Sequence, residues 1–151
     1  MKTIPWSVPE LLPHSRAMVL IDEAIGFGDG WVTAGVRIGE DCLFYEAGLG
    51  VPAWVGIEYM AQTVALYSGI LAKRAGEDIK IGLLLGTRRY EALTDYFLLG
   101  SYLEIHAHEE WQDGQMAVFD CRVEGDECLA TARLNVYRPQ DIGTVIRGDE
   151  A

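Results

Sequence analysis

One carboxylate stands inside a stretch that is otherwise apolar on nearly every side. Glu58 lies in the run VPAWVGIEYMAQTVALYSGIL, residues 51–71, and Gln62 follows four residues later. Residues four apart share a helix face, so Gln62 can orient the carboxyl group of Glu58 or a water molecule. Burial disfavours a charged carboxylate and raises its pKa. The pattern therefore marks Glu58 as a candidate functional residue.

Two histidines form a second candidate group. His106 and His108 alternate with Ile105 and Ala107 in LEIHAHEEW, so on a strand both imidazoles point to the same face. Zinc sites need further ligands at suitable spacing, and the sequence shows no third ligand pattern. We expect a solvated polar face here and no metal, with zinc binding as the alternative.

Composition excludes several classes of function. The chain has 151 residues, half of them hydrophobic, and a formal net charge of −11, which predicts one domain with a sizeable core. A nucleic-acid binder needs a basic face to meet phosphates, and an anionic membrane surface attracts basic segments. We therefore expect neither nucleic acid nor membrane as a partner.

The cysteines and the N-terminus favour a cytoplasmic protein. Cys42, Cys121 and Cys128 are odd in number and lack a disulfide spacing, which predicts reduced thiols. The N-terminal segment lacks the apolar run of a signal peptide. Residues 51–71 approach membrane-spanning length, but Glu58 and Gln62 among them favour a core helix.

The elements that position these residues can be read from periodicity and turn signals. Residues 1–15 are expected to be irregular, with one helical turn at 8–12. Strands are expected over 17–27 and 31–40, then a loop over 40–52 and the helix from 51 to about residue 74. Alternating apolar residues predict four more strands over 81–93, 101–111, 116–124 and 128–138. We assign residues 1–139 to the domain and 140–151 to a polar tail.

A helix that is apolar all round must be covered on most sides. A curved antiparallel sheet wrapped around one long central helix would cover it, and small residues such as Gly56 and Gly69 would allow close approach. This α+β layout is the hotdog fold. A single sheet leaves free edges, so we expect a dimer.

Two segments resemble a known family. LLPHSRAMVLIDEAI resembles the LLPHRYPFLLVDRV opening of the beta-hydroxyacyl-acyl-carrier-protein dehydratases, and VPAWVGIEYMAQ resembles their MPGVLIIEAMAQ helix start. The resemblance extends loosely over residues 8–138 and implies a hotdog fold. The wording VPAWVGIEYMAQT is most similar to the dehydratase-like proteins of aryl polyene gene clusters (the ApeP type).

The resemblance implies a reaction and assigns residues to it. These enzymes of fatty acid and polyketide biosynthesis remove water from a 3-hydroxyacyl thioester carried on the phosphopantetheine of an acyl carrier protein, with no other cofactor. Such chemistry needs a base, an acid and donors at the thioester oxygen. Glu58 matches the acid, and the amide of Ala53 matches the donor. Gln62, Val51 and Trp54 would lie beside the substrate.

The acid–base pair that the resemblance implies is incomplete in this chain. The family places a histidine in a GHFP turn, and the matching position here is Phe44. Three explanations stay open: a partner chain supplies the histidine, His14 acts as the base, or the chain is a silent subunit that stabilises an active paralogue. A thioesterase, in which Glu58 alone activates water, is a further alternative.

The partners follow from the same resemblance. We expect either a homodimer or a heterodimer with a histidine-bearing hotdog paralogue. Arg88 and Arg89, with Lys73, Arg74 and Lys80, are the densest basic cluster of the acidic chain. They are candidates to contact the carrier protein or its phosphate, and solvated surface charge is the alternative.

Overall fold

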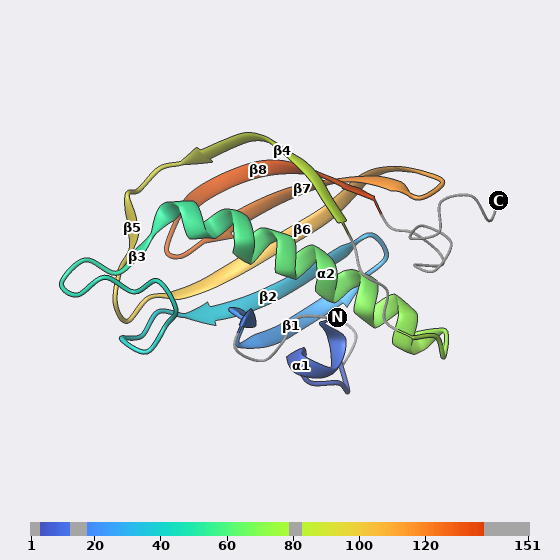
Figure 1. Ribbon diagram of the computed structural model, residues 1–151, viewed down its shortest axis with the longest axis horizontal. Helices are drawn as coiled ribbons and strands as arrows, with labels where there is room; N and C mark the ends of the chain where they lie inside the picture. The colour runs from blue at the N-terminus through green and yellow to red at the C-terminus, as the bar shows by residue number, and fades with distance from the viewer. Residues whose placement is uncertain (1–3, 13–17, 79–82, 138–151) are drawn as a thin grey trace.

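A long helix lies across the inner face of a curved antiparallel sheet (Figure 1). The computed structural model describes residues 4–12, 18–78 and 83–137. The helix is α2 (Gly56–Arg74), and the six strands of the sheet run in the order β1-β2-β6-β7-β8-β4. Their bounds are β1 (Glu23–Gly28), β2 (Trp31–Arg37), β4 (Leu83–Ala92), β6 (Tyr102–Asp113), β7 (Met116–Glu124) and β8 (Cys128–Tyr137). The predicted hotdog fold is confirmed.

Alternation along the strands builds the core between sheet and helix. In β8 the side chains of Ala130, Leu134 and Val136 are buried, whereas Thr131 and Arg133 are exposed. The strands β6, β7 and β8 pair in sequence as antiparallel neighbours. One face of the sheet therefore carries apolar side chains toward α2, and the other faces outward with polar ones.

Glycines in α2 let neighbouring elements approach its backbone. A Cβ added to Gly69 would overlap the carbonyl oxygen of Leu11, the last residue of the short helix α1 (Val8–Leu11). A Cβ added to Gly56 would overlap the hydroxyl of Tyr90. The helical turn predicted near residues 8–12 is thus present and packs on α2 at a position that only glycine allows.

The start of the helix differs from the prediction. The α-helix begins at Gly56 and not at residue 51, because Val51 and Pro52 form the short strand β3. This strand pairs with β5 (Tyr96–Phe97), and a 3-10 turn, η2 (Ala53–Val55), joins it to α2. Pro52 has extended angles, with φ −56° and ψ 140°, which places it before the helix.

The first sheet strand also starts later than predicted, at Glu23 and not at residue 17. The backbone of the preceding loop is bound elsewhere, because the amide of Leu20 and the carbonyl of Met18 bond to the side chain of Gln62. These two groups are therefore not available to a sheet ladder. The same contacts tie the loop to the middle of α2.

One stripe of α2 is left without full cover. Its half-buried members, Ile57, Glu58, Ala61, Ala65 and Ser68, recur every three or four residues on the same side of the helix. We call these five residues the open stripe. Four of them are small or apolar, so the sheet covers the helix on most sides but not on this one.

No helix in the described ranges has the length and hydropathy to cross a membrane. Several positions singled out from the sequence lie outside the described residues. They are His14, Lys80 and the tail 140–151. The proposed domain boundary at residue 139 also lies outside the described residues.

Candidate active site

Glu58 and Gln62 meet on α2, one turn apart. The side chain of Gln62 is fully buried, and its Nε2 donates to Oε1 of Glu58 at 3.2 Å. Glu58 itself is half-buried on the open stripe. A fixed donor on one carboxylate oxygen restricts the rotation of the group and leaves the other oxygen for a second partner.

Two backbone groups fix the orientation of the Gln62 amide. Its Oε1 accepts from the N–H of Leu20 at 2.9 Å, and its Nε2 also donates to the carbonyl of Met18 at 2.8 Å. Both Nε2 hydrogens are therefore used, one by Met18 and one by Glu58. The contact with Glu58 agrees with the spacing of four residues, whereas the link from Gln62 to the 18–20 loop was not predicted.

The turn before α2 carries backbone donors, but the Ala53 amide is not free. Its N–H donates to the carbonyl of Asp95 at 2.9 Å, because the pairing of β3 with β5 brings that carbonyl alongside. The expectation of a free donor at Ala53 is therefore corrected. The next amide, that of Trp54, has no acceptor within the part of the chain that the structure describes, as is usual for the first turn of a helix.

The hydroxyl of Tyr90 donates to the carbonyl of Ala53. Tyr90 lies on β4, and nothing in the sequence pattern marked it or Asp95 as part of the site. A β-bulge interrupts the register of β4 between Arg88 and Glu91. Strict alternation does not hold across a bulge, so sequence periodicity gives no sign of where Tyr90 points.

Phe44 occupies the loop position where the resemblance expected a histidine. Its φ is 72°, and its ring meets that of Trp54 edge-on, with centroids 5.1 Å apart and planes at 63°. Both side chains are exposed, Phe44 by 42% and Trp54 by 58%. Val51, the other residue predicted beside the substrate, is fully buried in β3.

Exposed apolar side chains gather at this end of the molecule. Figure 1 places the loops on either side of β3 and β5 beside the N-terminal end of α2. Of the ten large apolar side chains that are exposed among those whose burial the structure describes, seven belong to these segments. They are Leu43, Phe44, Leu49, Trp54, Leu93, Leu98 and Leu99, which we call the apolar rim.

A cavity of about 780 Å³ lies beside the loop that Gln62 holds. Tyr59 of α2, with Val19 and Leu20, supplies part of its wall, and Asp22 and Arg37 make the lining partly polar. Burial, more than the nearby acidic groups, raises the pKa of Tyr59.

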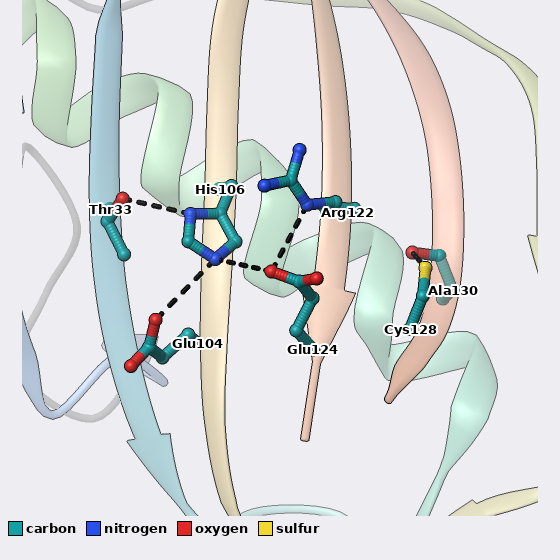
Figure 2. A network of polar contacts seen from close by, with 7 residues as sticks. All are labelled: Thr33, Glu104, His106, Arg122, Glu124, Cys128 and Ala130. Atoms are coloured by element: carbon teal, nitrogen blue, oxygen red, sulfur yellow. Dashed lines mark hydrogen bonds and ion pairs between the residues drawn. The ribbon is translucent and has the colours of Figure 1, made fainter. Parts of the chain in front are cut away.

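The two described histidines lie on the outer face of the sheet. Figure 2 shows His106 between Thr33, Glu104 and Glu124, with α2 behind the strands. Its Nδ1 is 3.0 Å from the hydroxyl of Thr33, and its Nε2 is 2.8 Å from Glu124 and 3.6 Å from Glu104. Burial, followed by the charge of Arg122, lowers the pKa of His106.

The histidines of this face lie apart from the helix that carries Glu58. The sheet separates His106 from α2 and so from Glu58 (Figure 2). His108 is exposed and pairs with Glu110 at 2.9 Å. No group of three metal-ligating side chains suited to an ion occurs among the residues that the structure describes.

The predicted basic cluster is divided between two elements, with Lys73 and Arg74 on α2 and Arg88 and Arg89 on β4. Arg74 is in the last turn of α2, with its guanidinium 5.4 Å from the ring centre of Phe27. Arg89, with φ 56°, is exposed on β4 and lines a groove of about 650 Å³ on the outer face, together with Glu91 and Asp120. A carrier-protein contact at Arg88 and Arg89 stays a prediction.

Comparison with known proteins gives a consistent result. The family described as "ApeP-like: ApeP dehydratase" matches residues 6–147. A chain of the dehydratase heterocomplex ApeI:P from Xenorhabdus doucetiae is 29% identical, with a TM-score of 0.84, over 96% of this chain and 99% of that one. The comparison with curated proteins yields no match.

More distant structures share the fold. A hypothetical thioesterase from Streptococcus pneumoniae TIGR4, solved with coenzyme A, is 14% identical with a TM-score of 0.63, over 78% of this chain and 84% of that one. The PaaI protein of the E. coli phenylacetic acid degradation operon is 14% identical with a TM-score of 0.60, over 76% and 81%. At this identity the likeness shows the fold alone.

The matched family covers nearly the whole chain, and its segment includes the helix that carries Glu58 and Gln62. The sheet wrapped around α2 and the match to the heterocomplex agree with it. This chain belongs to the ApeP-like dehydratase family, and it is a hotdog dehydratase subunit.

Proposed function

We propose that this chain is the acid-bearing subunit of a 3-hydroxyacyl thioester dehydratase whose base is a histidine of a second hotdog subunit. One observation carries the proposal. Gln62 holds the Glu58 carboxyl group on the open stripe of α2, while Phe44 stands where the base would be. The acid is thus placed at a surface that a neighbouring chain can reach.

The surface around Glu58 suits a protein partner. The open stripe is apolar apart from Glu58 and Ser68, and the apolar rim lies beside the N-terminal end of α2, the end that carries Glu58. Large exposed apolar patches on a globular protein mark interaction sites. The strand β4 forms one edge of the sheet, where it pairs with β8 alone among the described strands, and a free edge can extend into a second sheet.

The kind of partner follows from the relatives. The similar structure from Xenorhabdus doucetiae is a heterocomplex of dehydratase subunits. A second hotdog chain that carries a histidine in the loop matching Phe44 would complete the acid–base pair. A second copy of this chain would bring Phe44 again, so we favour a heterodimer over a homodimer.

The reaction then divides between the two subunits. The partner's imidazole takes the proton from the carbon beside the thioester carbonyl, and negative charge develops on the carbonyl oxygen. An amide donor in the turn before α2 stabilises that charge. Glu58 gives its proton to the departing hydroxyl, the C–O bond breaks, and water leaves. Gln62 keeps the Glu58 carboxyl group in position throughout.

The amide donor we assign is that of Trp54. The Ala53 N–H already bonds to Asp95. The Trp54 N–H is the next one in the turn, and the dipole of α2 adds partial positive charge at this end. The side chain of Trp54 points outward, so only its backbone serves the thioester.

The family suggests the substrate class and its setting. An acyl chain on the phosphopantetheine of a carrier protein, of the kind built by aryl polyene clusters, fits an ApeP-like dehydratase. The carrier would approach near Arg89, which is exposed on β4. The three cysteines are free thiols, which supports a cytoplasmic location.

The test mixes the chain with a hotdog protein that carries a histidine at the position matching Phe44. Glu58→Gln keeps the shape of the side chain but removes the proton, so formation of the enoyl thioester should fall by at least about a hundredfold. Glu127→Gln is the matched control, because Glu127 is exposed in the turn between β7 and β8. It should retain full activity.

The products separate the alternatives. Enoyl thioester from the complex but not from this chain alone supports the shared site. Free acid would identify a thioesterase, and full activity in the Glu58→Gln complex would identify a silent subunit. Either of these two outcomes would refute the proposal.

A further inference from the structure

One hydrogen bond at the start of α2 has no part in the proposed mechanism so far. The hydroxyl of Tyr90 donates to the carbonyl oxygen of Ala53, in the turn that precedes the helix. Tyr90 comes from β4 at the edge of the sheet, 37 residues further along the chain. A side chain from a distant strand therefore holds the backbone beside the site.

Three features of the structure direct this contact. The bulge between Arg88 and Glu91 shifts the register of β4 against β8, and bulges of this kind re-aim side chains. Arg89 within it has φ 56°, which turns the chain locally. Gly56 lacks the Cβ that would overlap the Tyr90 hydroxyl. Features of both β4 and α2 thus leave room for the Tyr90 hydroxyl at the Ala53 carbonyl.

The Tyr90 hydroxyl stays protonated and can act as a hydrogen-bond donor at neutral pH. Tyr90 is half-buried, and burial raises its pKa to about 12. It therefore keeps its proton throughout the neutral range. The Ala53 carbonyl oxygen has two lone pairs, so it accepts from the Tyr90 hydroxyl in addition to the Gly56 N–H, which it shares with the Trp54 carbonyl.

The carbonyl of Ala53 and the N–H of Trp54 belong to one peptide unit. A hydrogen bond to the carbonyl end polarises the unit and strengthens its N–H as a donor. On the other side, the Ala53 N–H is bound to Asp95. Both polar groups of Ala53 are thus engaged, which fixes the plane of the next peptide and the direction of the Trp54 N–H.

We infer that Tyr90 is a positioning residue for the dehydration reaction: its hydroxyl orients and polarises the 53–54 peptide so that the Trp54 N–H meets the thioester oxygen. The inference rests on the proposed function. Preorganised donors act on the charge that develops in the transition state. Loss of the Tyr90 hydroxyl should consequently lower kcat and leave KM nearly unchanged.

The first experiment removes one hydroxyl at a time in the complex with the histidine-bearing subunit. Tyr90→Phe keeps the ring and should lower kcat about tenfold, less than the hundredfold or greater loss of a whole donor. Tyr67→Phe is the matched control. Tyr67 lies on α2, and its hydroxyl also contacts the backbone, because it accepts from the N–H of Gly30 at 2.9 Å. It should leave kcat within about twofold.

The second experiment reads the hydrogen bond itself. A crotonyl-pantetheine probe labelled with ¹³C at the thioester carbonyl is bound to the complex, and its carbonyl stretch is measured by infrared difference spectroscopy. A strong donor lowers this frequency. Tyr90→Phe should return the band part of the way toward its position in water, whereas Tyr67→Phe should not move it.

A third variant reaches the same contact from the helix. Gly56→Ala places a methyl group where the Tyr90 hydroxyl lies, so it should cause a similar loss of kcat. Residues that act through one contact are not additive. The double variant Tyr90→Phe/Gly56→Ala should therefore be no slower than the slower single variant.

The outcomes distinguish the two proposals. An unchanged kcat and an unmoved carbonyl band in Tyr90→Phe, with Glu58→Gln inactive, would overturn this inference alone. Equal losses in Tyr90→Phe and Tyr67→Phe would also overturn it, since they would reflect a general loss of stability. A wild-type complex that neither binds the probe nor forms product would overturn the proposed function and this inference together.

Discussion

Replacing Gln62 with leucine would remove the polar link between the 18–20 loop and α2. Gln62 is fully buried, and it bonds the Leu20 N–H at 2.9 Å and the Met18 carbonyl at 2.8 Å. Leucine has nearly the same size and cannot form either bond. The substitution therefore leaves two part-buried backbone groups, the Leu20 N–H and the Met18 carbonyl, without the partner that Gln62 provides, and it creates almost no cavity.

The expected cost follows from those two groups. Leaving a buried donor or acceptor unsatisfied costs about 1–3 kcal/mol each, so the two together cost about 2–6 kcal/mol. Burial of the leucine side chain returns on the order of 1 kcal/mol. We expect a net loss of about 3 kcal/mol in the free energy of unfolding. For a domain of this size that lowers Tm by about 6–12 °C.

Urea unfolding followed by tryptophan fluorescence measures the change. Thr63→Val is the matched control, since Thr63 is equally buried and neighbours Gln62, but its Oγ1 bonds only the Tyr59 carbonyl within the same helix. That carbonyl already belongs to the helix ladder, so the control should lose less than about 1 kcal/mol. A Gln62→Leu variant within 1 kcal/mol of the parent would refute the reasoning.

Two further changes test the outer face and the α1 contact. Because burial lowers the pKa of His106, the unfolded chain takes up its proton first, and the fold loses stability as the pH drops below about 6.5. In His106→Gln the free energy of unfolding, measured by urea titration, should decrease less between about pH 6.5 and 5 than in the parent. An equal decrease in both proteins would show that His106 is not the cause. Gly69→Ala, whose methyl group would overlap the Leu11 carbonyl, should cost about 1–3 kcal/mol. The control Gly86→Ala, with no atom within 4 Å of the added Cβ, should stay within about 0.5 kcal/mol; equal losses would show that the α1 contact is not the cause.

The strands of the second half were predictable because their alternation is regular. The predicted ranges 116–124 and 128–138 agree with β7 and β8 almost residue for residue. The loop before β1 was not predictable in this way, because Val19 and Leu20 are residue types typical of strands. Their backbone is bound by Gln62, 42 residues away for Leu20, and no local pattern records a contact over that distance.

The start of the helix shows a different reason. Residues 51–55 are apolar and follow the helical pattern, but β5 pairs with Val51 and Pro52 and draws them into a strand. Sequence periodicity does not distinguish a 3-10 turn from the first turn of an α-helix. The family motif placed Glu58 and Gln62 correctly on the helix. It gave no sign of Asp95, whose carbonyl occupies the Ala53 amide.

The sequence raises two questions about Glu58: why a carboxylate lies on an apolar helix, and where its catalytic base is. The open stripe bears on both. A carboxylate on a fully covered helix would need a specific buried partner, since an unpaired buried charge costs several kcal/mol. The structure puts Glu58 on the one side of α2 that the sheet leaves uncovered, next to Ala61 and Ala65. Partial exposure keeps the carboxylate tolerable in the isolated chain. Its apolar neighbours on the stripe remain half-exposed until another surface covers them, and a second subunit that buries them would also enclose Glu58. The proposed heterodimer would therefore account for both the uncovered helix face and the missing base, because the site would be completed only on association.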